Sequence, residues 1–285
     1  MAPQDHKPKA LVLAGFGLNC DLETAHVLQL AGAEAQRVHI SELTGTARTP
    51  PSRTLEPFHI LVFDGGFSWG DDHGAGVLLA TRLRRHLRAQ LEDFLARGGL
   101  VLGICNGFQA LVNLGLLPLL EGRWERSVAL LPNDCGNFQD RWVELVVEED
   151  SPCVFTRGLR RLELPVRHAE GKFVAAEDTL ARIEAQGLVA LRYARGGRPA
   201  GGRWPANPNG SLHDIAGICD PSGRIFGLMP HPEAFYRISQ HPRWTRQREK
   251  ARRRGRELDP FSPGQGLALF ANAVAAAREI VRSAA

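Results

Sequence analysis

Three short apolar runs that end at or beside glycine constrain the fold of this 285-residue chain more than any other feature. They cover residues 10–15, 59–66 and 99–105, and such nearly continuous apolar runs are typical of strands covered on both faces. Amphipathic segments at about 21–31 and 77–95 separate them and are expected to be helices. This alternation predicts an α/β fold, a doubly wound and mostly parallel sheet with helices on both faces. Functional residues are then expected at the carboxyl ends of its strands.

The second half of the chain has a different pattern but continues the same architecture. Alternating or apolar runs predict further strands at 142–149, 161–167, 188–194 and 215–228, the last a hairpin through 220–223. Ser262, followed by Pro263, predicts the start of a C-terminal helix over 263–282. Strand patterns flank the Gly/Pro/Arg-rich stretch 195–210, so we interpret residues 1–285 as one domain.

Composition excludes several classes of protein. A hydrophobic share of 44% is too high for a disordered chain. Five cysteines without a Cys-x-x-Cys pair argue against a disulfide framework or a structural zinc site, and no cluster has metal-ligand spacing, so no metal is expected. The N-terminus lacks an apolar signal region, and the uncharged stretch 100–120 contains too many polar residues and glycines to favour a membrane span. A reducing, cytoplasmic location is expected.

The positive charge of the chain is local. The net charge is +4, but residues 237–256 hold nine Lys and Arg against Glu249 alone, which leaves 26 basic and 30 acidic residues elsewhere. No nucleic-acid recognition motif accompanies this segment. It is either a solvated face or a surface that docks a protein partner or covers a site entrance.

The strongest local motif is Gly103-Ile104-Cys105-Asn106-Gly107, where a strand is expected to meet a helix. It has the form of a nucleophile elbow, in which the flanking glycines permit a strained turn that exposes the nucleophile. A cysteine at a helix N-terminus also lies at the positive end of the helix dipole, which favours the thiolate. The alternative is a buried structural thiol.

A cysteine nucleophile needs a base with an orienting carboxylate. Three histidines have one close in sequence: His231 with Glu233, His168 with Glu170, and His213 with Asp214. His231 follows an apolar run and is therefore expected at a strand end. The residues themselves favour it only modestly over His168, which has the same spacing to its acid.

Acyl transfer also requires donors for an oxyanion. The amide after the nucleophile, at Asn106, is one expected donor, and the glycine pair Gly65-Gly66 is either the second or an ordinary tight turn. Gly15-Phe16-Gly17 begins like a dinucleotide fingerprint, but Cys20 stands where the third glycine belongs. No Walker A sequence is present.

Taken together, these segments resemble class I glutamine amidotransferases, which have a flavodoxin-like fold. Within that class the chain is similar to the glutaminase subunits of phosphoribosylformylglycinamidine synthases. The resemblance rests on seven ordered segments: GLNCD (17–21), GGFSWGD (65–71), GICNGFQALVNLGLLP (103–118), PVRHAEGKF (165–173), NPNGS (207–211), IAGICD (215–220) and GLMPHPE (227–233).

The resemblance implies a triad, a set of oxyanion donors and a set of glutamine-binding residues. These are Cys105 as nucleophile, His231 as acid/base and Glu233 as its orienter; the amides of Gly66, Phe67 and Asn106; and Gln109, His168 and Gly171. Two residues depart from the family pattern, Ala169 in place of Gly and Ala234 in place of Arg.

The resemblance also implies an activity and partners. Glutamine would be hydrolysed through a Cys thioester, and the ammonia would pass to a synthetase subunit (PurL), assisted by a small subunit (PurS), that makes formylglycinamidine ribonucleotide in purine biosynthesis. ATP and Mg would bind to the synthetase, with no cofactor on this chain and neither nucleic acid nor membrane as a partner. The alternatives are another class I amidotransferase or a stand-alone Cys hydrolase on the same fold.

Overall fold

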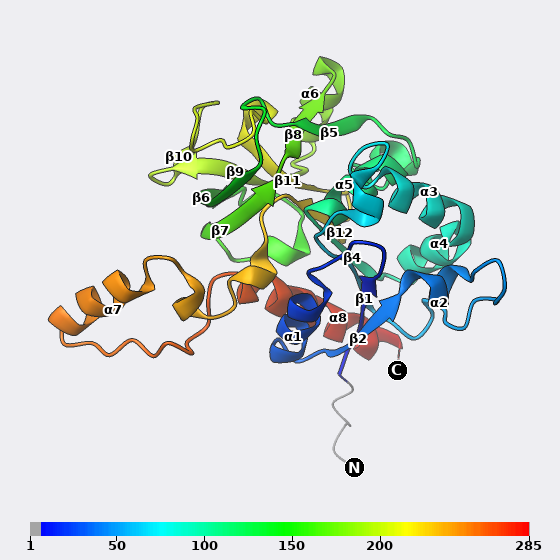
Figure 1. Cartoon of the computed structure of the whole chain (residues 1–285), viewed down its shortest axis with the longest axis horizontal. Helices are drawn as coiled ribbons and strands as arrows, with labels where there is room; N and C mark the ends of the chain where they lie inside the picture. The colour runs from blue at the N-terminus through cyan, green and yellow to red at the C-terminus, as the bar shows by residue number, and fades with distance from the viewer. Residues whose placement is uncertain (1–6, 285) are drawn as a thin grey trace, which may run out of the picture.

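A mixed sheet, parallel in one half and antiparallel in the other, forms the centre of the computed structural model, which describes residues 7–284 (Figure 1). Its strands are β1 Lys9–Ala14, β2 Glu34–His39, β3 Ile60–Phe63, β4 Leu100–Ile104, β6 Gln139–Val147, β7 Arg161–His168, β9 Val189–Arg195, β10 Arg198–Pro199, β11 Ile215–Cys219 and β12 Ile225–Leu228. They follow the order β2-β1-β3-β4-β12-β11-β9-β6-β7, with β10 paired to β9. The segment from β2 to β12 is parallel and the remainder antiparallel. The predicted α/β sheet is confirmed.

Helices cover both faces of the sheet, as the sequence predicts (Figure 1). On one face α1 (Asp21–Leu30) packs against β1 and against α8 (Leu267–Ala284). On the other face α3 (Val77–His86) packs against α5 (Asn106–Leu114), which contacts β3, β4 and β12. The strand that ends at Cys105 is therefore enclosed, and its nucleophile candidate lies where β4 gives way to α5.

Two predicted helices have different bounds in the structure. The expected helix over 77–95 is divided into α3 and α4 (Arg88–Ala96), because buried Leu87 leaves the helical conformation with φ −122°. The final helix begins at Leu267 rather than Pro263. Ser262 does not cap it, and the side chain of Gln265 instead accepts a hydrogen bond from the Glu163 amide at 2.6 Å.

The sequence patterns missed several short elements at the two ends of the sheet. β5 (Val128–Pro132) and β8 (Glu170–Ala175) pair as a separate two-stranded sheet, and β8 leads into α6 (Glu177–Ala185). The short helix α2 (Ile40–Thr44) follows β2 and is capped by the side chain of His39. Among the described residues, no helix is long and apolar enough to cross a membrane.

The segment at 237–263 extends away from the body of the molecule, and we call it the basic arm. It contains α7 (Trp244–Arg253) and, in Figure 1, forms the orange projection on the left. Its only buried residue is His241. Its two ends meet in an antiparallel bridge between Arg237 and Pro263. The basic arm is thus a long insertion, closed at its base, between the turn after β12 and the start of α8.

Candidate active site

Cys105 occupies a strained turn between β4 and α5. Its backbone has φ 49° and ψ −104°, a conformation that a non-glycine residue holds only when its surroundings impose it. The flanking glycines explain how the turn packs. A Cβ at Gly103 would lie 2.6 Å from the Leu111 side chain, and one at Gly107 would collide with the Phe63 carbonyl. The elbow geometry predicted from the motif is present, and Cys105 is 5% exposed.

His231 and Glu233 form a buried pair beside this elbow. β12 is the parallel neighbour of β4, and the Cys105 amide donates to the Leu228 carbonyl at 2.8 Å, so the residues after β12 lie next to the nucleophile. Nδ1 of His231 lies 2.6 Å from Oε1 of Glu233. Nε2 of His231 is buried without a hydrogen-bond partner among the described residues, which leaves it free for the thiol.

The electrostatics of the pair favour a charged imidazole. Burial lowers the pKa of His231, but the negative charges of Glu233 and of a Cys105 thiolate outweigh it and raise the pKa well above its usual value. The arrangement therefore favours a protonated imidazole on His231, beside the candidate nucleophile.

His168 lies in a different environment from His231, although its sequence spacing to an acid is the same. Its Nδ1 lies 3.0 Å from Oδ1 of Asn133, whose amide group donates to the His168 carbonyl at 2.8 Å. Glu170 is turned away and accepts a bond from the Ala75 amide at 3.4 Å. Burial, and then the charge of His231, lowers the pKa of His168 to about 3. His168 is thus a neutral ring without a carboxylate, unsuited to act as the base.

Gly171 and Gln109 pack closely around this ring and the elbow. A Cβ at Gly171 would lie 2.7 Å from Nδ1 of His168, so glycine there makes room for the imidazole. Gln109 donates from Nε2 to the Glu170 carbonyl at 2.7 Å and accepts from Asn106 at 3.1 Å. Both polar groups of Gln109 are thus bonded within the protein, and its side chain joins α5 to β8.

Two of the three amides expected to donate to the oxyanion remain available for that role. The Phe67 amide donates to the Gly17 carbonyl at 2.9 Å, so the expectation that it faces an oxyanion is wrong for this conformation. The amide of Gly66 has no such acceptor among the described residues, and that of Asn106 opens α5, where helical N–H groups lack partners. Gly66 has φ 148° and packs so closely on Gly17 and Leu18 that a side chain would not fit.

The structure adds three polar residues that the motifs did not single out. Cys20 lies with its Sγ 4.0 Å from Nδ1 of His231, and burial raises its pKa to about 11, so it is a neutral thiol. Asp64 is fully buried, and burial, together with the charges of Asp21 and Glu233, raises its pKa well above the usual range. Asp71 accepts a bond from the Asn106 side chain at 2.8 Å, and burial raises its pKa to about 6.

Three of these groups lie close enough together to be metal ligands. Atoms of Cys20, His231 and Glu233 lie within 4.8 Å of one another, a cluster that spacing along the chain does not reveal. A metal bound there would have to displace the hydrogen bond between His231 and Glu233. The sequence expectation of no metal stays a prediction.

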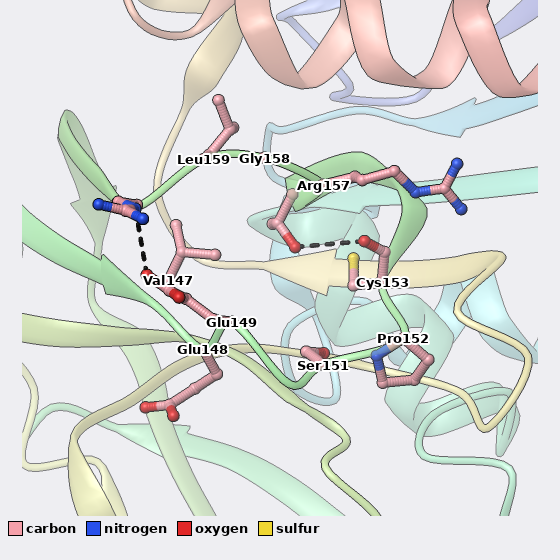
Figure 2. A pocket seen from close by; sticks show the side chains of 11 residues that line it. Val147, Glu148, Glu149, Ser151, Pro152, Cys153, Arg157, Gly158 and Leu159 are labelled. Atoms are coloured by element: carbon pink, nitrogen blue, oxygen red, sulfur yellow. Dashed lines mark hydrogen bonds and ion pairs between the residues drawn. The ribbon is translucent and has the colours of Figure 1, made fainter.

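A separate cavity of about 330 Å³ lies at the far end of β6 and β7, at the opposite end of β7 from His168. Figure 2 shows its lining, formed by the loop that joins these two strands, with Cys153 on one wall and Glu148 and Glu149 opposite. It contains none of the residues that surround Cys105, so the cavity and the catalytic candidates are distinct.

A cysteine on a nucleophile elbow, a buried His–Glu pair and a mixed sheet define a cysteine-dependent amide-hydrolysing enzyme of the α/β class. The family model of the CobB/CobQ-like glutamine amidotransferase domain matches residues 7–275, and the chain belongs to this family.

Two relatives within the family are named as the same enzyme subunit. The chain is 44% identical, over 96% of its length and 99% of the relative, to the phosphoribosylformylglycinamidine synthase subunit PurQ of Dehalococcoides mccartyi. It is 43% identical to the PurQ subunit of Methanococcus maripaludis strain S2, over 94% of this chain and 96% of the relative. A chain in the PurLQS structure from Thermotoga maritima is similar in fold to this chain, with a TM-score of 0.66 and 28% sequence identity. The match covers 95% of this chain and 99% of the Thermotoga chain.

Proposed function

We propose that this chain is the glutaminase subunit of a phosphoribosylformylglycinamidine synthase. The observation that carries the proposal is the position of Cys105, on a strained elbow directly beside the buried His231–Glu233 pair. Membership of the glutamine amidotransferase family and identities of 44% and 43% to PurQ subunits support glutamine as the substrate.

The geometry supports a two-stage hydrolysis. His231 holds the proton of Cys105, and the thiolate attacks the side-chain carboxamide carbon of glutamine. The amides of Gly66 and Asn106 stabilise the oxyanion, and His231 then protonates the departing ammonia. In the second stage His231 activates water, which hydrolyses the γ-glutamyl thioester to glutamate and restores the thiol. Glu233 holds the imidazole in one orientation and stabilises its charge throughout.

Neutral His168 is proposed to contribute to glutamine binding. Its Nδ1 is directed to Asn133 Oδ1, so Nδ1 carries the proton and Nε2 is an acceptor without a partner among the described residues. Such an acceptor suits the α-ammonium group of the substrate. Gln109 and Gly171 act less directly, because one joins α5 to β8 and the other makes room for the His168 ring.

The ammonia is proposed to pass to a synthetase subunit and a small subunit, which correspond to PurL and PurS of the Thermotoga maritima assembly. That synthetase would bind ATP and Mg and convert formylglycinamide ribonucleotide to its amidine. We place the reaction in the cytoplasm, which suits five cysteines that are all present as free thiols.

The decisive experiment compares glutamine with ammonia as nitrogen donor in the reconstituted complex. Cys105→Ser should abolish glutamine-dependent amidine formation and leave ammonia-dependent formation unchanged, because only the first requires the thiolate. Cys153→Ser, at a buried thiol that lines the separate cavity, is the matched control and should retain both activities. Glutaminase activity in Cys105→Ser would disprove the assignment of the nucleophile.

A further inference from the structure

The basic arm concentrates charge on an exposed projection. It carries nine of the 35 Lys and Arg residues of the chain but only three acids, Glu249, Glu257 and Asp259. No residue of α7 is buried, and the helix projects from the body of the molecule (Figure 1). Its charges therefore face solvent, and they contribute nothing to a core.

Most of these charges have no acidic partner among the residues that the structure describes. Arg243 pairs with Glu163 at 2.7 Å, and Arg252 and Arg253 pair with Glu249 at 2.8 and 2.9 Å. The remaining six lie beyond 4.0 Å from every acidic group of the described residues: Arg237, Arg246, Arg248, Lys250, Arg254 and Arg256. Like charges four residues apart, such as Arg246 and Lys250, destabilise an isolated helix. The stability of α7 does not explain why they are there.

The arm is fastened to the turn that carries the catalytic pair. The amides of Gly264 and Gly266 donate to the carbonyls of Tyr236 and Phe235 at 2.8 and 2.9 Å. A Cβ at Gly266 would collide with the Pro232 carbonyl. The chain that returns from the arm therefore lies directly against Pro232, between His231 and Glu233.

An aromatic and ionic cluster fixes the base of the arm on the sheet. The ring of His241 lies 4.6 Å from that of Trp142 on β6 and 5.7 Å from that of Phe235. Glu163 on β7 lies 3.2 Å from Nε2 of His241 and also pairs with Arg243. The base is therefore rigid, while the exposed helix beyond it makes no comparable contacts.

The residue types of the arm are those of protein interfaces. Eight of its nine basic residues are Arg, which is enriched at interfaces, and one is Lys, which is depleted there. Arg248 lies 4.7 Å over the ring of Trp244, and Arg237 lies 5.2 Å over that of Phe261, which is 67% exposed. Aromatic and Arg side chains are the usual centres of binding energy.

We propose that the basic arm docks an acidic face of the synthetase subunit. The inference rests on the proposed function, in which the synthetase must lie where ammonia is released. A protein seated on the base of the arm lies beside the 232–235 turn, and hence beside His231 and Glu233, because the chain that returns from the arm is hydrogen-bonded to Phe235 and Tyr236. Opposite charges there speed association and fix the orientation of the two subunits.

The test measures the affinity of the full chain for the purified synthetase and small subunits at about 50 and about 300 mM salt. The arm variant is Arg246→Gln/Lys250→Gln/Arg254→Gln, which removes three unpaired charges spaced four residues apart on one face. The control is Arg85→Gln/Arg157→Gln/Arg282→Gln, which removes three exposed charges from the body. We expect the arm variant to weaken binding about tenfold at low salt and to lose much of the salt dependence, and the control to stay within about twofold. Equal melting temperatures, and equal rates of Cys105 labelling by a glutamine analogue, show that fold and site are intact.

Three results would overturn the proposal. The arm variant could bind the synthetase with the affinity and salt dependence of the control. It could lose only self-association, in which case the occupant is a second copy of this chain. It could lose only binding to a short oligonucleotide, in which case the occupant is a nucleic acid. The binding assay requires no catalysis, so a wild-type complex that releases no glutamate would refute the proposed function separately from the docking surface.

Discussion

Oε1 of Glu233 lies 2.6 Å from Nδ1 of His231, and the side chains of Glu233 and His231 are only 1% and 3% exposed. The turn that joins them, Pro232–Ala234, is a single 3₁₀ turn. It folds the chain back so that residues two apart meet, which an extended strand cannot do because its side chains two apart are separated by nearly 7 Å. The contact fixes the orientation of the imidazole and leaves Nε2 without a hydrogen-bond partner among the described residues.

Replacing the carboxylate should weaken catalysis without loss of structure. Glu233→Gln preserves volume but removes the negative charge that raises the pKa of His231. We expect the glutaminase kcat to fall at least about 100-fold. The pH dependence of Cys105 alkylation should shift as well. When the pKa of His231 is lower, its imidazole becomes neutral at a lower pH, and a Cys105 thiolate then lacks a positively charged neighbour. An unchanged alkylation profile would contradict the role assigned to Glu233.

Gly65 is predicted to be required for the position of His231. A Cβ at residue 65 would lie 2.7 Å from Cε1 of His231 and 3.2 Å from Sγ of Cys20. Gly65→Ala should therefore push the imidazole out of line and lower kcat more than it raises KM. The control is Gly136→Ala, at a position with φ 66° and open space, which should cost about 1 kcal/mol of stability and keep full activity. Steady-state kinetics of the two variants, beside their melting temperatures, provide the test.

His168 should make the protein less stable in mild acid. Its pKa falls from 6.5 to about 3 on folding, so the unfolded chain binds a proton between these values that the folded chain does not. Its contribution to stability is full above pH 6.5 and is lost as the pH falls toward 3. Near pH 5 the loss is about 2 kcal/mol relative to neutral pH.

The test for His168 compares unfolding free energies of wild type and His168→Asn, which keeps a donor for Asn133, at both pH values. We expect the difference between the two proteins to change by about 2 kcal/mol on acidification. His73→Asn, at a largely exposed histidine, is the control and should show no such change. A parallel pH dependence of wild type and His168→Asn would contradict a neutral buried His168.

Strain at the nucleophile predicts an unusual order of stability. With φ 49° and ψ −104°, Cys105 occupies a region that glycine tolerates far better than any residue with a Cβ. Cys105→Gly should therefore be more stable than Cys105→Ala by about 1–3 kcal/mol, although both are inactive. Chemical denaturation of the two variants measures this directly. An alanine variant as stable as the glycine variant would show that the elbow is not strained.

The sequence anticipated the elements that depend on local backbone chemistry. The strand β4 and the glycines around Cys105 were predicted correctly, because a buried parallel strand and a strained turn each require particular residues at adjacent positions. β5 and β8 were missed, since these short strands pair only with each other and have little apolar periodicity. The prediction that Ser262 caps the final helix was wrong. Gln265 takes part in a tertiary contact with the Glu163 amide, and this contact outweighs the local preference for a helix start at Ser262.

The sequence by itself determined the α/β class, the elbow at Cys105 and the local origin of the positive charge. The resemblance implied that Glu233 orients His231, and the tertiary structure shows that His231 and not His168 has a carboxylate partner. Only the tertiary structure shows that the Gly66 amide lacks an acceptor among residues 7–284, whereas the Phe67 amide is bonded to Gly17. The physical reason is the same for each case. A strained turn or a buried strand is specified by neighbouring residues, but hydrogen-bond partners and proton affinities depend on which distant segments the fold brings into contact.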